Sequence, residues 1–118
     1  MRMWMVPPES MCRQHLLGEH YELHKFVGSM AKKKNLSEYL KKGYLDGSQV
    51  GYRHFAIMNE MIKRGYNHNS PLKSVCTEGY NSIINVRRSI EELSRRCPEC
   101  RKKIKKHFVF VNIKKETK

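Results

Sequence analysis

Residues 14–23 read Gln-His-Leu-Leu-Gly-Glu-His-Tyr-Glu-Leu and lie within the longest helical pattern of the chain. The residues that follow one helical face, at steps of four and three positions, are Leu16, His20, Leu23, Val27 and Met30. Two prolines, a glutamate and a serine precede this pattern, a composition typical of the start of a helix. We therefore expect a helix that begins between residues 8 and 11, runs to about residue 27 and buries this face.

The opposite face of the same helix is polar. At steps of four, four and three positions it carries Gln14, Gly18, Glu22 and Lys25. A glycine inside a helix costs about 1 kcal/mol relative to alanine, so Gly18 predicts that another part of the chain packs closely against the helix backbone. A surface glycine that is simply tolerated is the alternative.

Two further helices are predicted beyond a basic, glycine-rich loop over residues 32–51. The first covers residues 52–64, with an apolar face of Phe55, Met58, Met61 and Ile62 and with Gly65 at its end. The second covers residues 82–96 and stops before Pro98, with an apolar face of Ile83, Val86, Ile90 and Leu93. The sequence thus predicts an all-α, compact single domain of about three helices over residues 1–96, with residues 97–118 as a basic tail of the same domain.

The charge of the chain favours a polyanionic partner. Its 118 residues hold 24 Lys and Arg against 11 Asp and Glu, a net charge of +13, and residues 95–118 contribute ten of these cations and two acids. A fold of this size and charge excludes large nucleotide-binding sheets and barrels and favours nucleic acid. No apolar run approaches the roughly 18 residues that span a bilayer, so we expect no membrane partner. Residues 107–113 alternate aromatic and β-branched side chains, which predicts a short strand or an ordered terminal arm.

The four cysteines are scattered rather than densely spaced, which favours reduced thiols. Pro7 and Pro8 interrupt the N-terminal residues before a signal-peptide core, which predicts an intracellular protein of the cytoplasm or nucleoid. Cys97-Pro98-Glu99-Cys100 has half of a zinc-knuckle spacing, and a complete site would need Cys12, Cys76 or a histidine from elsewhere. Plain thiols are the favoured interpretation, so neither a metal nor another cofactor is assigned.

Two separated segments resemble one known family. Residues 14–23, followed by Lys25, Phe26 and Gly28, resemble the first helix of the phage-type pyrimidine-dimer DNA glycosylases with apurinic-site lyase activity, the endonuclease V family. Residues 60–72, Glu-Met-Ile-Lys-Arg-Gly-Tyr-Asn-His-Asn-Ser-Pro-Leu, resemble the second helix and turn of cellular members. The resemblance covers roughly residues 1–93. It implies a repair enzyme that acts on UV-induced pyrimidine dimers in double-stranded DNA, as a monomer and without a cofactor.

The resemblance also implies which residues react. Family members use the α-amine of the first residue as nucleophile and a glutamate of the first helix beside it, which here are Met1 and Glu22. Arg2 falls at the family's following arginine, and its size should prevent removal of Met1. An α-amino group has an ordinary pKa near 7.7–8.0, against about 10.4 for lysine, so far more of it is neutral and nucleophilic. The extended residues 2–6 must then lie across the first helix.

DNA contacts are expected from residues around this centre. By the resemblance, Arg2 and Lys25 would meet phosphates and Gln14 would touch DNA or order the pocket, while Tyr21 replaces a family arginine. The basic charge of the chain adds Arg64, Lys102 and Lys103 to the predicted DNA contacts. His15, His54 and His68 are read as packing or capping residues rather than catalysts. Two alternatives remain: the same imine chemistry on another damaged base or abasic site, and a non-catalytic basic nucleic-acid-binding module.

Overall fold

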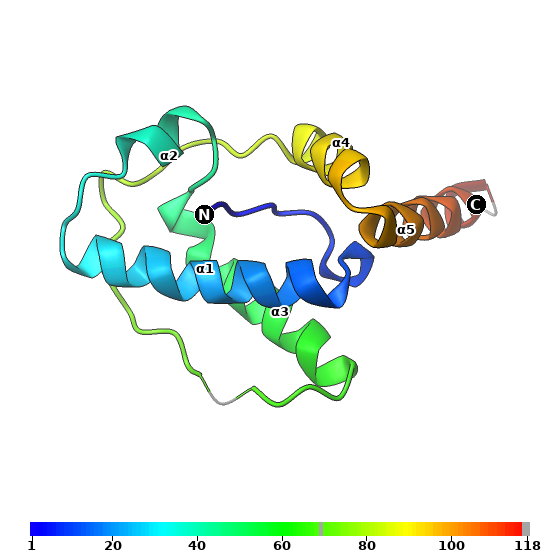
Figure 1. The fold of residues 1–118 in the computed structure, drawn as a ribbon, viewed down its shortest axis with the longest axis horizontal. Helices are drawn as coiled ribbons and strands as arrows, with labels where there is room; N and C mark the ends of the chain where they lie inside the picture. The colour runs from blue at the N-terminus through cyan, green and yellow to red at the C-terminus, as the bar shows by residue number, and fades with distance from the viewer. Residues whose placement is uncertain (69, 117–118) are drawn as a thin grey trace.

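The computed structural model describes residues 1–68 and 70–116, and the helices within these ranges define the fold (Figure 1). They are α1 (Arg13–Ala31), α2 (Ser37–Lys41), α3 (Val50–Lys63), α4 (Val86–Arg96) and α5 (Pro98–Glu116), with short 3-10 turns η1 (Pro8–Ser10) and η2 (Gly47–Gln49). The described ranges contain no strand. The predicted all-α class is therefore confirmed.

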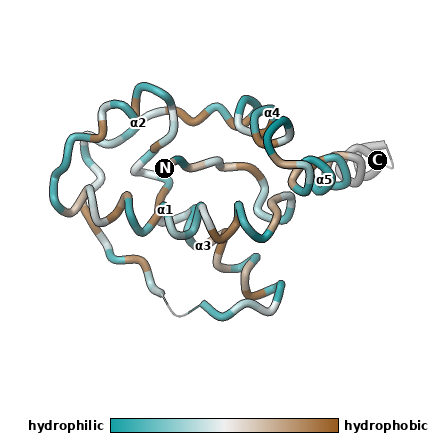
Figure 2. Tube along the Cα trace, in the orientation of Figure 1, coloured by the Kyte–Doolittle hydropathy of each residue, from teal (hydrophilic) through white to brown (hydrophobic). Residues whose placement is uncertain are grey.

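The N-terminal residues run extended beside α1, between that helix and α4 (Figure 1). α1 packs against α3, and α5 packs against both α4 and η1. Met3 and Val6 have no exposed surface, and Trp4 is also buried, so the extended segment is part of the core. The predicted extended segment packed between helices is confirmed. In Figure 2, α4 and the first part of α5 are mostly hydrophilic, as the basic composition of this region requires.

Two of the expected helices begin later than predicted. α1 begins at Arg13, because Cys12 takes the N-cap position and its Sγ accepts a hydrogen bond from the amide of His15. The residues before it form η1, with Pro7 as its N-cap and Pro8 at its first position. α4 begins at Val86 rather than residue 82. The Oγ of Ser82 instead donates to the carbonyl of Leu45 at 2.6 Å, which keeps this stretch extended along the loop before η2. α3 agrees with its predicted range to within two residues.

Two segments were predicted wrongly. Residues 107–113 belong to α5, not to a strand or arm. α5 starts with a proline at its first position, which suits a helix start, and Cys100 and Ile104, one helical turn apart, are both buried. Residues 32–51, expected to be a loop, contain α2 and η2. Tyr39 of α2 packs edge-on against Phe26 of α1, with ring centroids 5.4 Å apart, so this contact holds α2 against α1.

A buried ion pair joins α1 to α3. The Nε and Nη2 of Arg53 donate to the two carboxylate oxygens of Glu19 at 2.6 and 2.9 Å, and the two side chains are 4% and 0% exposed. The remaining Nη1 donates to the carbonyl of Val6 at 2.7 Å. Because a bidentate pair fixes both distance and angle, this one contact orients the two helices and the N-terminal segment together.

Replacing Arg53 by methionine should lower the free energy of unfolding by about 3–5 kcal/mol, because Glu19 would remain as a buried charge without its partner. Urea denaturation monitored by circular dichroism measures the loss. The matched control is Arg87→Met, which breaks the exposed pair of Arg87 with Glu91 (3.5 Å, 91% and 68% exposed). That change should cost at most about 1 kcal/mol. Equal losses in the two variants would contradict a central role for Arg53.

Candidate active site

The backbone of the first residues is tied to α1 at Glu22. The amide of Arg2 donates to Glu22 Oε2 at 3.0 Å, and the amide of Met3 donates to the carbonyl of Tyr44 at 2.7 Å. Three covalent bonds separate the Arg2 nitrogen from the α-amine of Met1. The carboxylate of Glu22 therefore lies next to the residue that carries the amine, as the family resemblance implies.

The side chain of Arg2 anchors the same segment from the other side. Its guanidinium lies against the rings of Trp4 and Tyr44, 3.8 and 4.2 Å from their centroids. Its Nη1 donates to Glu92 Oε2 at 2.7 Å, and its Nη2 donates to the hydroxyl of Ser89 at 3.4 Å. The hydrogen bond from Arg2 holds the pKa of the Glu92 carboxyl below its usual range. Arg2 is thus committed to protein partners, and contact with a phosphate would require it to leave them.

A cleft of about 760 Å³ opens beside Arg2, between α2 with the following loop and α4. Its wall is mostly polar and carries more cations than acids: Arg2, Lys41, Lys42, Arg88 and Arg95 against Glu91 and Glu92. Tyr44 adds an aromatic ring to the wall. The cleft is therefore suited to bind an anion that carries a flat ring, and it lies beside Arg2.

The outer face of α1 presents the predicted DNA contacts as one exposed stripe. Gln14, Tyr21 and Lys25 are exposed, and the Lys25 ammonium lies 4.6 Å from the centroid of the Tyr21 ring. Gly18 lies among them, and a Cβ added there would have no atom within 4 Å outside its own helix. The prediction of close packing at Gly18 was therefore wrong, and the alternative, a tolerated surface glycine, describes it.

The other predicted cations lie apart from this stripe. Arg64 follows the end of α3, and its Nη2 donates to the carbonyls of Pro8 and Met11 at 3.2 and 2.7 Å. It holds η1 in place, so a DNA contact by Arg64 would compete with this role. Lys102 and Lys103 are exposed on α5. Their contact with DNA stays a prediction.

The residues that hold Arg2 were missed by the sequence analysis. Ser89 and Glu92 lie 87 and 90 positions from Arg2 in the chain. The predicted helix over residues 82–96 includes both residues but gives them no role, and no local pattern connects this helix with the N-terminus. A glutamate flanked by arginines on α4 was the one available signal, and it is common on exposed helices.

Four histidines lie against one another between α1, α3 and the loop that follows. The Nε2 of His68 is 2.8 Å from that of His20 and 3.3 Å from that of His54. The ring of His24 packs edge-on against those of His20 and His54, with centroids 4.9 and 5.1 Å apart. Burial lowers the pKa of His20 to about 4, aided by the neighbouring imidazoles. The ring of His20 is therefore uncharged at neutral pH.

This cluster should make the fold sensitive to acid. A histidine in an unfolded chain titrates near pH 6.5, so between about pH 6.5 and 4 the unfolded state binds more protons at His20. The contribution of His20 to stability is therefore complete above about pH 6.5 and declines as the pH falls toward 4. Urea midpoints measured across this range should fall less steeply in His20→Gln than in the wild type. Parallel curves would contradict the assignment.

Two groups of side chains in the described part of the chain could hold a metal ion. One is His20, His54 and His68, whose shortest contact has the length of a hydrogen bond. The other is Cys12, His15, Cys97 and Cys100, which comes from both ends of the chain.

Comparison with known proteins gives one match. No curated protein and no solved structure matches the chain. No helix in the described ranges is both long and apolar enough to cross a membrane. A family model described as pyrimidine dimer DNA glycosylase matches residues 1–74, which include the N-terminal segment, α1 and α3.

Proposed function

The chain belongs to the pyrimidine dimer DNA glycosylase family, and we propose that it also cleaves the damaged strand, through an imine formed by the α-amine of Met1. The hydrogen bond from the Arg2 amide to Glu22, 3.0 Å long, is the observation that carries this proposal. It ties the backbone next to Met1 to a carboxylate. A terminal amine beside a carboxylate is a nucleophile with a proton carrier at hand.

The reaction begins when the neutral amine donates its lone pair to C1′ of the damaged nucleotide. The bond from C1′ to the base breaks, and the base leaves with a proton. The nitrogen lone pair then forms a double bond to C1′ as the bond from C1′ to O4′ breaks and O4′ takes up a proton from water through Glu22, which opens the sugar ring. The nitrogen keeps its second proton, so the product is a protonated imine between Met1 and C1′. Loss of a proton from C2′ expels the 3′ phosphate by β-elimination, and water finally hydrolyses the imine and restores the amine.

Glu22 serves two needs of this sequence. Its negative charge stabilises the cationic sugar and the iminium ion, which develop where the substrate sits beside Met1. Its carboxylate also accepts and returns the protons that ring opening and elimination move. The bond to the Arg2 amide keeps one carboxylate oxygen directed at the N-terminal backbone, so the charge stays near the reacting nitrogen.

The charged side chains near the N-terminus suit the binding of a damaged DNA duplex. Lysines and arginines line the cleft beside Arg2, and Lys25 lies on the exposed stripe of α1. Such cations neutralise phosphates and position the strand without reading its sequence. C1′ is reached most easily when a nucleotide is turned out of the helix, and the cleft of about 760 Å³ beside Arg2 offers space for the displaced base.

Extending the chain by a few residues before Met1 should abolish both base removal and strand cleavage, because it converts the amine into an amide. Incubation with pyrimidine-dimer DNA and borohydride should trap the wild-type protein covalently, with the adduct on residue 1 by mass spectrometry. An extension of equal length after Lys118 is the matched control and should be trapped normally. An adduct mapped to a lysine would overturn the assignment, and no adduct at all would favour the plain binding module.

Replacing Glu22 by glutamine should reduce single-turnover cleavage by about 10²–10⁴-fold with DNA affinity nearly unchanged. The amide oxygen of glutamine still accepts the bond from Arg2, so the variant removes charge and proton transfer but keeps the acceptor. Glu38→Gln, an exposed residue of α2, is the control. Weak DNA binding together with normal single-turnover rates would contradict the role of Glu22.

The residue at position 21 favours a second class of substrate beside pyrimidine dimers. Tyr21, where the resemblance has an arginine, is 62% exposed beside Lys25. Imine formation at C1′ does not depend on which base leaves, so the same centre would also act on an abasic site or another damaged base. A panel of duplexes, each with a single defined lesion, separates these substrates by their relative rates.

A further inference from the structure

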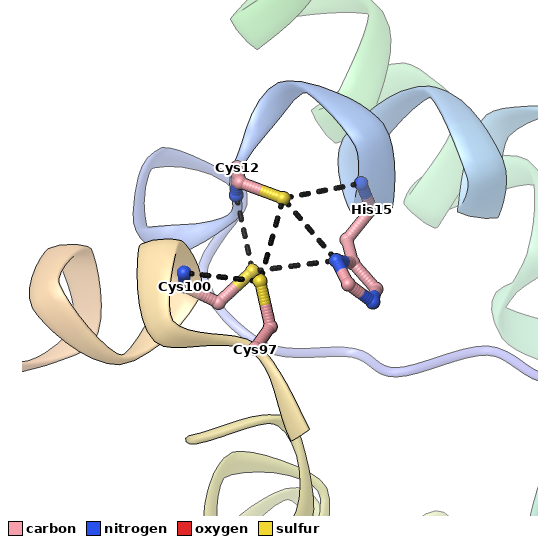
Figure 3. A group of neighbouring side chains, drawn as sticks. All are labelled: Cys12, His15, Cys97 and Cys100. Atoms are coloured by element: carbon pink, nitrogen blue, oxygen red, sulfur yellow. Dashed lines mark hydrogen bonds between the residues drawn. The ribbon is translucent and has the colours of Figure 1, made fainter. Parts of the chain in front are cut away.

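Three cysteines and a histidine meet where the two ends of the fold join (Figure 3). Cys12 caps α1, and His15 lies in its first turn. Cys97 ends α4 and Cys100 lies in the first turn of α5. The three cysteines are buried, with Cys100 fully so, and His15 is half-buried. Figure 3 shows all four side chains pointing toward one another.

Two of the distances between their donor atoms equal those around a tetrahedral zinc ion, and the others are short enough for one ion to bind all four. Bond lengths of about 2.3 Å to sulfur and about 2.05 Å to nitrogen place two sulfurs about 3.8 Å apart and a sulfur and a nitrogen about 3.6 Å apart. Here the Sγ atoms of Cys97 and Cys12 are 3.8 Å apart, and Cys100 Sγ lies 3.6 Å from His15 Nδ1. Cys12 Sγ lies 3.2 Å from the same nitrogen. All four donor atoms lie within 4.8 Å of one another.

Backbone amides donate hydrogen bonds to the three sulfurs, as they do to thiolates in metal sites. The amide of Cys12 donates to Cys100 Sγ at 3.2 Å, and the amide of Cys100 donates to Cys97 Sγ at 3.4 Å. The amide of His15 donates to Cys12 Sγ at 3.5 Å. Each sulfur therefore receives an N–H, an arrangement that orients ligands and stabilises their negative charge.

We propose that Cys12, His15, Cys97 and Cys100 bind one structural zinc ion. Three thiol protons leave as three zinc–sulfur bonds form, and the neutral imidazole supplies the fourth bond through Nδ1. Soft thiolates combined with imidazole in a tetrahedron select zinc over calcium or magnesium. Four protein ligands leave no open position, so the ion has no direct part in catalysis, and the site stands whether or not the proposed imine chemistry is correct.

The ion would clamp the basic α5 to the start of α1. The ring of His15 also packs edge-on against Trp4, with centroids 6.1 Å apart, and Trp4 in turn lies against the guanidinium of Arg2. The proposed site thus supports the wall behind the N-terminal segment. The histidine cluster is a weaker candidate because it offers three nitrogens and no thiolate.

The test uses the full chain, purified without an affinity tag from cells grown with zinc. Elemental analysis should find one zinc per chain in the wild type, in Cys76→Ser and in His20→Gln, and none in Cys97→Ser. Cys76 is the matched control because it is exposed and lies outside the cluster. Zinc retained in Cys97→Ser but lost in His20→Gln would overturn the proposal and assign the metal to the histidines.

Two further measurements decide the matter if Cys97→Ser fails to fold. In the wild type, only Cys76 should react with a thiol reagent before chelation, and all four cysteines should react after it. Chelation should also lower the melting temperature by about 10 °C or more, and cobalt added back should give the absorption of a tetrahedral thiolate complex. Immediate reaction of all four thiols, an unchanged melting temperature or cobalt without thiolate bands would each overturn the site.

Discussion

The buried pair of Arg53 and Glu19 is the constraint on which the arrangement of the site depends. Both groups are removed from water, so each is tolerated only because the other is present and every strong donor finds an acceptor. The third bond, to the carbonyl of Val6, extends this constraint to the N-terminal segment. Met5, just before it, has a left-handed backbone with φ of 59°, a conformation that persists only where surrounding contacts enforce it. The interior of the fold therefore determines where the chain end emerges.

From that point the first residues are held on two sides. Glu22 receives the amide of Arg2, and the side chain of the same residue crosses to Ser89 and Glu92 on α4. One residue thus connects the helix that supplies the carboxylate with the helix that lines the cleft. An α-amine is attached to the most flexible part of most chains, so fixing its neighbour on both sides reduces the freedom that a reactive geometry must lose.

Local periodicity in the sequence predicted the helical class and the buried face at Leu16 and Leu23. The family resemblance predicted that the N-terminus approaches Glu22. It could not predict what depends on helix crossings. Glu19 lies in the quoted segment, yet a charged residue is normally exposed, and only the position of Arg53 on α3 makes it a core residue. The alternation of aromatic and β-branched residues over 107–113 predicts a strand, yet these residues continue α5. The buried side chains of Cys100 and Ile104 hold the earlier part of this helix against the core. The spacing of Cys97 and Cys100 likewise left open whether Cys12, Cys76 or a histidine would join them, and only the fold places Cys12 and His15 beside them.

Arg2 and its partners on α4 lie far apart in the sequence, so they are synthesised at different times. A ribosome makes the N-terminus first, but the contacts that fix it involve residues 87 and 90 positions later. The side chain of Arg2 can therefore reach its final partners only after α4 has been synthesised. A truncated chain that lacks α4 would keep the bond from the Arg2 amide to Glu22 but would lose the second anchor at Ser89 and Glu92.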